Sequence, residues 1–314
     1  VNGLVFIDEK TKNAHSIRAK SIVNAAGPWV DALRSSDQSL YGKRIQHSKG
    51  VHLVFAHANI PLKHAIYFDL PDGRMMFAIP RNECTYVGTT DTFYKESLEH
   101  PVITRDDIEY ILTGINQILE KGHVQKEMIL SMWSGVRPLI YEEGKNASEL
   151  SRHDEIMVSP SGLISIAGGK LTGYRSMAED VVNLVMKKLD LKTIECSTKT
   201  IRLFGGDFNA KMDVQRALEE FCEKAKLMNI LPSKIVPLFH KYGTELNAIL
   251  GIFDSFNNKY RFPLTAAELI YCIQFEQCQS LCDFYVRRTG YLYFEKSLIQ
   301  TDQIVESGLI LQEF

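Results

Sequence analysis

The chain has 314 residues, and its 36 lysines and arginines nearly balance its 38 aspartates and glutamates. A formal net charge of −2 with 45% hydrophobic residues is typical of a globular chain and gives no reason to expect a nucleic-acid partner. The length favours about two domains. The sequence contains no apolar run of about 18 residues and no signal-peptide pattern, so it predicts no membrane-spanning helix.

Cysteine spacing indicates neither a disulfide framework nor a metal centre. None of the six cysteines belongs to a C-x-x-C pair, and no histidine lies at zinc-ligand spacing near the last three. The pattern favours reduced, partly buried thiols, as in a cytosolic protein, and we expect no metal site. The cysteines are Cys84, Cys196, Cys222, Cys272, Cys278 and Cys282.

The first part of the chain predicts a hairpin, a strand and a tight turn. Residues 3–7 are apolar, and residues 16–24 alternate, which indicates two strands. The turn Asn24–Trp29 follows, and a short helix is expected over 29–33. The chain opens at Val1 without an initiator methionine, so we interpret it as part of a longer protein.

The middle of the chain predicts an antiparallel sheet with one helix. Asp72-Gly73 is a typical hairpin turn between two of its strands. Residues 104–121 show helical spacing of apolar side chains, with Thr104 as the N-cap. The strands are expected at 50–56, 65–69, 74–80, 84–90 and 128–133.

Further along, strand signals give way to helices. A strand at 163–167 ends at Gly168-Gly169, and a helix is expected over 172–189. Its predicted buried stripe consists of Tyr174, Ala178, Val181, Val185 and Leu189. After a linker near 190–206, the sequence predicts helices at 211–228, 233–242, 244–252 and 264–277.

The segment Ala167–Arg175 places two glycines and a lysine at a strand-to-helix junction. Glycine lets a backbone or a flat ligand approach closely, and the helix start offers free N–H groups beside the Lys170 charge. Such a junction suits an electron-rich ligand edge. A phosphate-binding Walker motif is excluded, because Ile164 and Leu171 occupy its required positions. An ordinary turn with a surface lysine is the structural alternative.

Two further segments carry groups suited to chemistry. Arg137, which follows Gly135-Val136 and precedes Pro138 in SGVRP, and Arg152, in SRHD, could bind a phosphate or carboxylate, or could form structural ion pairs. His52 enters an apolar strand after Lys49-Gly50. It could accept a proton from a substrate hydroxyl, or could be a satisfied core histidine.

Together these segments resemble one family, the FAD-dependent glycerol-3-phosphate dehydrogenases. The resemblance spans nearly the whole chain, and DFYVRRTG at 283–290 resembles the family's C-terminal helical domain. The motifs that carry it, in order, are NAAGPW (24–29), KGVH (49–52), YVGTTD (86–91), SGVRPL (134–139), SRHD (151–154) and GGKLTGYR (168–175).

The resemblance implies a mixed fold with α/β and α+β parts. Residues 1–44 and 155–195 would be the remaining parts of a Rossmann-like FAD-binding domain. Residues 45–154 would form the antiparallel substrate-binding sheet, and 196–314 an all-α domain. The family's G-x-G-x-x-G fingerprint is absent, so the chain is similar to the C-terminal portion only.

FAD is the cofactor that the resemblance implies. Gly27 would lie at one approach to it. The residues that would line its isoalloxazine ring are Gly168, Gly169, Lys170, Leu171 and Thr172.

The same resemblance makes His52, Arg137 and Lys170 the catalytic candidates. His52 would take the hydroxyl proton of glycerol 3-phosphate, and Arg137 and Lys170 would hold the substrate beside the flavin. Arg152 would help to neutralise the phosphate. The product would be dihydroxyacetone phosphate.

The resemblance also implies a membrane quinone as electron acceptor, a peripheral position at the cytoplasmic face of the membrane and a possible homodimer. Three alternatives stay open: an oxidase that uses oxygen, a folded but non-catalytic fragment, and an amine oxidase of the same superfamily. A phosphate-carrying substrate fits the motif set better than an amine does.

Overall fold

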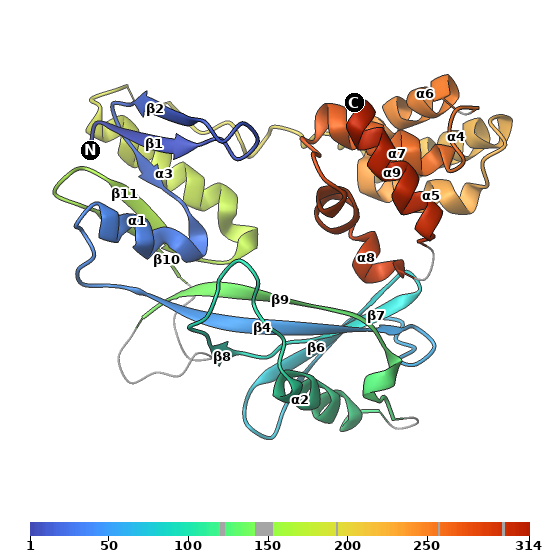
Figure 1. The fold of residues 1–314 in the computed structure, drawn as a ribbon, viewed down its shortest axis with the longest axis horizontal. Coiled ribbons are helices and arrows are strands. Elements are labelled where there is room, and N and C mark those ends of the chain that lie inside the picture. The colour runs from blue at the N-terminus through green and yellow to red at the C-terminus, as the bar shows by residue number, and fades with distance from the viewer. Residues whose placement is uncertain (120–122, 142–152, 193, 257, 297–298) are drawn as a thin grey trace. The chain divides into compact units, whose positions relative to one another are not determined.

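The computed structural model describes residues 1–314 except 120–122, 142–152, 193, 257 and 297–298. Contacts between residues divide the chain into two compact units, Val1–Thr198 and Lys199–Phe314. The first unit holds all the sheets, and the second consists of helices among its described residues (Figure 1). The predicted combination of sheets followed by an all-α part is confirmed.

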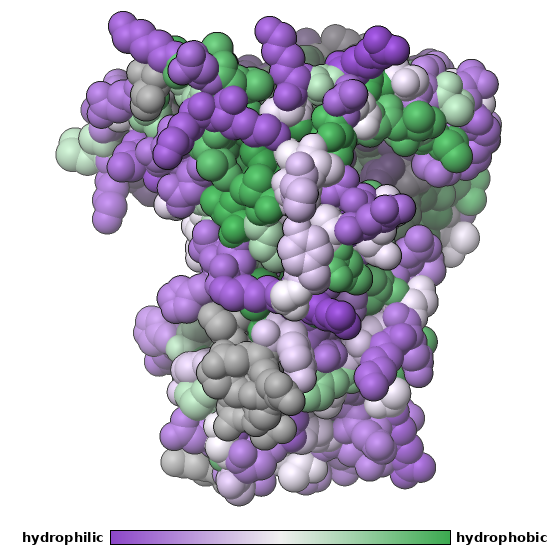
Figure 2. Space-filling view, turned by 90° about the vertical axis from the view of Figure 1, so that its left-hand side faces the viewer, coloured by the Kyte–Doolittle hydropathy of each residue, from purple (hydrophilic) through white to green (hydrophobic). Residues whose placement is uncertain are grey.

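A two-stranded hairpin begins the first unit. β1 (Gly3–Ile7) pairs antiparallel with β2 (Ala14–Arg18). The predicted hairpin and following strand are confirmed: the chain leaves the hairpin after Arg18 and joins another sheet as β3 (Val23–Asn24). Hydrophobic hairpin side chains such as Val5 are exposed. Figure 2, viewed from the side of the hairpin, shows hydrophobic side chains gathered at the surface in its upper part.

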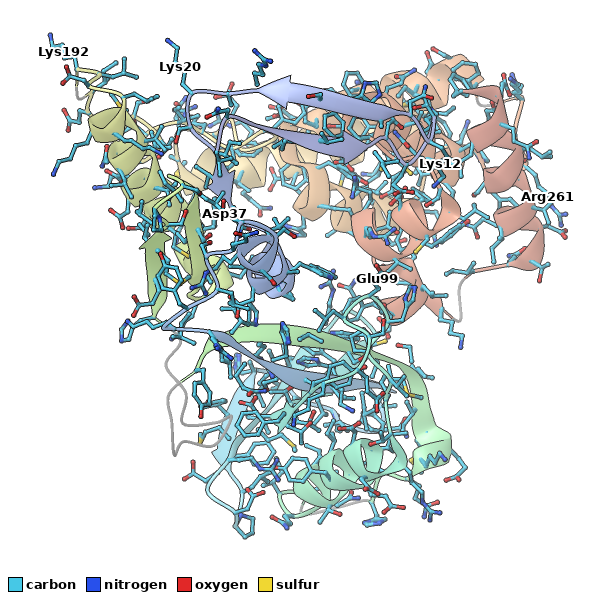
Figure 3. The ribbon with its side chains drawn as sticks, turned by 60° about the vertical axis from the view of Figure 1, so that its left-hand side comes forward. Lys12, Lys20, Asp37, Glu99, Lys192 and Arg261 are labelled. Carbon is cyan, nitrogen blue, oxygen red and sulfur yellow. The ribbon has the colours of Figure 1, made fainter. Side chains whose placement is uncertain are left out.

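β3 belongs to a three-stranded sheet in the order β10–β11–β3, in which β11 is parallel to β3. Each of these two parallel strands leads into a 3₁₀ turn and then a helix. Asp37, labelled in Figure 3, follows the first helix and accepts hydrogen bonds from Ser161 Oγ. The elements are β10 (Asp154–Val158), β11 (Ile164–Gly168), η1 (Gly27–Trp29), α1 (Val30–Ser36), η3 (Leu171–Gly173) and α3 (Tyr174–Lys188).

The buried stripe predicted for α3 is partly wrong. Val181 and Val185 pack against β11, but Tyr174 is 60% exposed and Ala178 is also exposed. Met177 packs there instead. The stripe that meets the sheet therefore consists of Met177, Val181, Leu184 and Val185.

The larger sheet has six strands, and β4 pairs with three of them. β4 is antiparallel to β9 on one edge and to β7 and β8 on the other. The strand predicted at 128–133 continues seven residues further, so the SGVRP segment lies within β9. The strands are β4 (Ile45–Ala56), β5 (Ile66–Asp69), β6 (Met75–Arg81), β7 (Cys84–Gly88), β8 (Thr92–Phe93) and β9 (Ile129–Ile140), preceded by η2 (Lys126–Met128).

Helix α2 (Arg105–Asn116) covers one face of this sheet, and side chains fill the layer between them (Figures 1 and 3). Thr104 is its N-cap, as predicted, in a capping box with Asp107. The helix ends before the expected residue 121. The Asn116 side chain bonds both the N–H and the C=O of Val124, each at 2.9 Å, and so joins the helix end to the returning chain.

An ion pair is buried in the same layer. Lys49 Nζ donates to Asp107 Oδ2 at 2.5 Å and to the Val102 carbonyl at 2.9 Å. Burial by itself raises the pKa of Asp107, but hydrogen bonds from Lys49 and Thr104 outweigh that effect and lower it. The pair thus fixes the start of α2 against the centre of β4.

The helical unit has a single core of buried residues, to which its principal helices contribute. The four helices predicted here are confirmed, and prolines occupy the first turns of two of them. The elements are α4 (Lys211–Leu227), α5 (Pro232–Tyr242), η4 (Gly243–Glu245), α6 (Leu246–Phe256), α7 (Pro263–Phe275), the π-helical η5 (Asp283–Arg288), α8 (Tyr291–Phe294) and α9 (Thr301–Glu313).

A carboxylate is buried within that core. Glu268 accepts hydrogen bonds from Lys241 Nζ at 3.0 Å, Tyr242 OH at 2.8 Å and Tyr291 OH at 2.6 Å. Burial, and then the Glu268 charge, raise the pKa of both tyrosines. The three donors come from α5 and α8, so the network joins those helices to α7.

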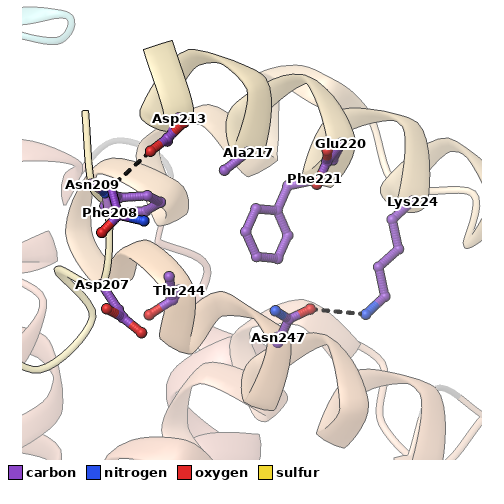
Figure 4. Close-up of a pocket in the computed structure, with 10 residues that line it drawn as sticks. All are labelled: Asp207, Phe208, Asn209, Asp213, Ala217, Glu220, Phe221, Lys224, Thr244 and Asn247. Atoms are coloured by element: carbon purple, nitrogen blue, oxygen red, sulfur yellow. Dashed lines mark hydrogen bonds between the residues drawn. The ribbon is translucent and has the colours of Figure 1, made fainter. Parts of the chain in front are cut away.

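A pocket of about 430 Å³ lies beside α4 and α6 (Figure 4). Phe221 and Thr244 contribute to its lining. Three of the charged groups around it have internal partners: Asp207 pairs with Arg202, Asp213 accepts from Ala210 N at 3.0 Å, and Lys224 Nζ donates to Asn247 Oδ1 at 3.2 Å. The sequence motifs include none of the residues that line this pocket.

Replacing Lys49 with Met should lower the free energy of unfolding of the first unit by about 3–5 kcal/mol, because Asp107 would remain buried without its partner. Both tryptophans, Trp29 and Trp133, lie in this unit, so urea unfolding followed by tryptophan fluorescence measures it. Replacing Arg105, which forms an exposed pair with Glu109, should cost only about 0.5 kcal/mol.

The same pair should weaken in acid. Because the folded pKa of Asp107 lies below its ordinary value of 3.8, its contribution is complete above that pH and is lost as the pH falls further. An equal loss from Lys49→Met and Arg105→Met would contradict the role assigned to the buried pair.

Replacing Glu268 with Ala should lower the stability of the helical unit by about 3 kcal/mol, since two tyrosine hydroxyls and Lys241 would lose their acceptor. Thermal unfolding followed by the helical circular dichroism signal measures this. The exposed Glu313, paired with Lys259, is the matched control. Since the pKa values of Tyr242 and Tyr291 are raised, the unit should also lose stability as the pH rises above 10. A fully stable Glu268→Ala variant would contradict the assignment.

Candidate functional site

His52 lies in a row of side chains that crosses four strands of the larger sheet. In register, Trp133 of β9 is opposite His52 of β4, His52 is opposite Gly88 of β7, and Gly88 is opposite Phe77 of β6. Opposed residues point to the same face, so the four positions share the face away from α2. The helix-facing residues of β4 alternate with them and include Val51 and Leu53.

The His52 ring is enclosed by aromatic groups. Its centroid lies 4.9 Å from that of Trp133 in a stacked arrangement, 5.5 Å from that of Phe77 and 6.4 Å from that of Tyr86. A side chain at Gly88 would collide with the ring, because an added Cβ would lie 2.4 Å from its Cδ2 atom. Glycine at this position therefore makes room for the imidazole.

Burial sets the protonation state of His52. Burial, and to a smaller extent the Arg137 charge, together lower its pKa to about 4. The Nδ1 atom is buried and has no hydrogen-bond partner among the described residues. The ring is therefore neutral at pH 7, with a nitrogen whose hydrogen-bonding capacity the described residues leave unused.

Arg137 lies on the same face, two rows along the sheet. Between the rows of His52 and Arg137 stand two opposed glycines, Gly50 and Gly135. The Arg137 guanidinium lies over Gly50, where an added Cβ would be 2.4 Å from Nη2. The corresponding space above Gly135 is open, with nothing within 4 Å. The guanidinium thus fills the space over Gly50, whereas Gly135 leaves open space in the side-chain layer between Trp133 and Arg137.

The guanidinium is held by the segment between β7 and β8. Arg137 Nη2 donates to Thr89 Oγ1 at 3.0 Å, and Nη1 lies 3.4 Å from both the Thr90 carbonyl and Asp91 Oδ1. Asp91 also accepts a hydrogen bond from Ser48. Arg137 is 29% exposed at its side chain, so it remains accessible while these groups fix its position.

The first glycine turn follows β3 and is fixed by Asn24. The Asn24 amide donates to the Val30 carbonyl at 2.9 Å and to Ser165 Oγ at 3.2 Å, and its oxygen accepts from Ala26 N. Gly27 has φ of +55°, and an added Cβ would meet nothing within 4 Å. The turn therefore presents open space at the start of η1, which has no side-chain cap.

The second glycine turn follows β11, the parallel neighbour of β3. Gly168 and Gly169 have φ near +78° and +77°. Neighbouring residues of the chain occupy the space where a side chain would lie. An added Cβ would collide with the His153 carbonyl oxygen at Gly168 and with the Met177 side chain at Gly169. The close approach of another backbone is thus observed at Gly168. η3 also begins without a side-chain cap, at Lys170.

Lys170 is exposed, and so are Leu171, at 90%, and Thr172. No hydrogen bond or ion pair among the described residues joins Lys170 to His52 or Arg137. The turn nevertheless abuts the strand of Arg137, because Ile140 of β9 lies against Gly168. Three residues along a strand separate Ile140 from Arg137, a span of about 10 Å. The structure therefore brings His52 and Arg137 to one face and Lys170 to one end of the same strand pair.

Two contacts connect the glycine turns to the β4–β9 pair. Val30, Ile140 and Ala167 form one buried cluster. On β4, a ring nitrogen of His47 lies 2.7 Å from the Pro28 carbonyl. Arg152 lies outside the described residues, while Asp154 of the same motif begins β10.

Sequence reasoning missed Asp91, Thr89, Trp133 and Gly135 as members of this face. Thr89 and Asp91 were present only as letters of the YVGTTD motif. The alternation of β9 could have placed Trp133 and Gly135 beside Arg137, had the strand been extended beyond residue 133.

Among the described residues, no group of histidines, cysteines and carboxylates is arranged to hold a metal ion. The six cysteines are free thiols. None of the helices in the described ranges has the length and apolar character required to cross a bilayer.

Family comparison matches both parts of the chain. Residues 1–175 match the model of the FAD dependent oxidoreductase family, and residues 196–306 match the C-terminal domain of alpha-glycerophosphate oxidase. Curated relatives include the aerobic glycerol-3-phosphate dehydrogenases of Bacillus subtilis, 43% identical over 95% of this chain, and of Staphylococcus aureus, 44% identical over 94%. The chain spans about half the length of these relatives, 55% and 54%.

A solved structure matches the fold. The glycerol-3-phosphate dehydrogenase of Bacillus halodurans, complexed with FAD, superposes with a TM-score of 0.88 at 38% sequence identity. The match covers 99% of this chain and 64% of that one. With 175 of its 314 residues matched by the family model, the chain belongs to the FAD-dependent oxidoreductase family.

Proposed function

We propose that this chain carries the substrate face of a flavin-dependent enzyme that oxidises sn-glycerol 3-phosphate to dihydroxyacetone phosphate. The observation that supports this most directly is the placement of a neutral imidazole and an accessible guanidinium on one sheet face, beside the open space above Gly135. The names of the curated relatives and of the Bacillus halodurans structure agree with it.

The residues present fit FAD at the two glycine turns. β3 and β11 are parallel and end at the same edge, where each opens into an uncapped helical turn. Such an edge is where α/β sheets bind dinucleotides, because backbone N–H groups and helix N-termini face the ligand. The open space above Gly27 and the exposed Lys170, Leu171 and Thr172 would contact the cofactor there. When bound, FAD would supply the acceptor for the hydride of carbon 2.

Arg137 would bind the substrate phosphate. A guanidinium presents several N–H donors in a planar fork that matches phosphate oxygens. The contacts to Thr89 and Asp91 already fix this side chain, so little conformational entropy remains to be lost on binding. Lys170 and Arg152 would add positive charge around the same anion.

His52 would accept the proton of the carbon-2 hydroxyl. A pKa of about 4 keeps the ring neutral, and therefore able to accept, across the physiological pH range. It also makes the ring a weak base. A weak base suffices if the hydroxyl proton is transferred as the hydride leaves, because the hydroxyl then becomes strongly acidic.

Two candidate functions differ in the electron acceptor. A dehydrogenase would pass electrons to a membrane quinone, from a peripheral position at the cytoplasmic face, whereas an oxidase would reduce oxygen. The match of residues 196–306 to an oxidase domain favours keeping the second candidate. Peroxide release during turnover, compared with quinone reduction, distinguishes them in the longer protein. A homodimer is compatible with both.

Titration of this chain with FAD tests the cofactor assignment. Quenching of flavin fluorescence, with loss of the quench in a Gly27→Val variant, would support it. If the chain does not bind FAD even at high FAD concentration, the cofactor assignment is wrong for this polypeptide, which would then be a folded but non-catalytic part.

Replacing Arg137 with Met should lower kcat/KM for glycerol 3-phosphate by about 100-fold or more in the FAD-loaded protein that contains this chain, because the phosphate would lose a charged partner. Arg105→Met, on the helix covering the opposite face, is the matched control. Equal kinetics for the two variants would remove Arg137 from the substrate site.

His52 should titrate with a pKa of about 4, well below the ordinary value of 6.5. Nuclear magnetic resonance of the histidine-labelled chain measures this, with the His52 signal assigned by its loss in His52→Asn. Because the folded pKa is depressed, protonation should destabilise the first unit progressively as the pH falls from 6.5 toward 4. Titration near 6.5 would contradict the buried, neutral imidazole.

A further inference from the structure

β7 and β8 are two halves of one strand, interrupted by a bulge. Gly88 of β7 is opposite His52 on β4, and Thr92 of β8 is opposite Lys49. Residues 89–91 therefore stand opposite residues 50–51, three against two. An extra residue of this kind bends a strand and redirects its side chains, and bulges are frequent beside active sites.

At this bulge, hydrogen bonds of a side chain replace the backbone hydrogen bonds between the strands. Thr90 Oγ1 accepts a hydrogen bond from Val51 N at 3.1 Å and donates to the Lys49 carbonyl at 3.4 Å. Thr90 is 1% exposed. With Thr90 bonded in this way, its carbonyl and the flanking side chains of Thr89 and Asp91 are directed to the face that carries His52.

The Arg137 side chain crosses β4 to reach them. It starts on β9, passes over Gly50 and ends at Thr89, Thr90 and Asp91 on the other edge of β4. The Asp91 side chain is only 9% exposed, whereas that of Arg137 is 29% exposed. The carboxylate is therefore the covered partner, and the guanidinium is the accessible one.

We propose that Asp91 is a positioning residue that holds the Arg137 guanidinium over Gly50, ready for the phosphate of a small phosphorylated substrate. This inference rests on the proposed function of Arg137. Asp91 acts through the arginine and not on the substrate, because a carboxylate repels a phosphate dianion and this one is covered. The bulge at 89–91 and Gly50 are the two features that make the crossing possible.

The test uses His52 as a local sensor of the Arg137 charge, in the chain without any ligand. The other groups around the ring are Trp133, Phe77 and Tyr86. Because the Arg137 charge contributes to the lowered His52 pKa, Arg137→Met should raise that pKa and gives the reference value. Nuclear magnetic resonance titration is the measurement.

Asp91→Asn should also raise the pKa of His52 toward that reference, because the released guanidinium leaves its place over Gly50. The opposite sign would overturn the proposal: if Arg137 stayed in place, loss of the Asp91 negative charge would lower the pKa instead. Gly50→Ala, which displaces the guanidinium by collision and changes no charge, should reproduce the rise. Asp106→Asn, an exposed carboxylate at the start of α2, should leave the titration unchanged.

A second readout concerns the substrate. In the FAD-loaded protein, Asp91→Asn should raise KM for glycerol 3-phosphate by about 10-fold while kcat changes much less, since the arginine would have to be ordered on binding. An unchanged KM in both Arg137→Met and Asp91→Asn, alongside a raised His52 pKa, would retain the positioning of Arg137 by Asp91 but remove the role of Arg137 toward the substrate. If Arg137→Met alters KM and Asp91→Asn does not, the proposed function survives and the positioning role fails.

Discussion

The pairing of β4 with β9 is the constraint on which the first unit depends. Each strand has twelve residues, and they remain in register from Ile45–Ile140 to Val54–Ser131. This pairing sets the spacing between His52 and Arg137, because each belongs to one of the two strands. The same strands carry Ile140 and His47, which connect the sheet to the glycine turns.

Successive residues of β4 point to opposite faces of the sheet, one packed against α2 and the other carrying the candidate site. Residues that point toward α2 belong to the hydrophobic core, and Lys49, on that side, forms the buried pair with Asp107. Residues that point the other way are His52 and Gly50. Because one strand serves both faces, the packing of α2 keeps the face that carries His52 in place without contributing any group to it.

Much of the fold could be predicted from local patterns. Apolar periodicity gave the strands of the larger sheet and the four principal helices, and Thr104 was found as a cap from its residue type and the acidic turn after it. The hairpin and the strand after it were predicted, but the parallel pairing of β3 with β11 could not be found, because β11 lies far along the chain. Nor could the early end of α2, which results from the bond between Asn116 and Val124.

The site shows a similar division. Residue chemistry marked His52 and Arg137 as groups suited to chemistry but left a structural role open for each, and only the resemblance to the family made them catalytic candidates. Their proximity could not be derived without the cross-strand register. No local sequence pattern indicates a role for Asp91. Its position beside Arg137 depends on the bulge at residues 89–91, which is apparent only from the pairing of β4 with β7 and β8.

The bulge also determines which alignment of the strands is possible. A slip of β4 by two residues would keep every side chain on its face, so the hydrophobic pattern alone would tolerate it. It would, however, place Ser48 or His52 beneath the Arg137 guanidinium in place of Gly50. It would also remove the Val51 amide from Thr90 Oγ1, which accepts its hydrogen bond in the observed register. Gly50 and Thr90 therefore favour the observed register over a slipped one. The same register brings the Arg137 guanidinium over Gly50.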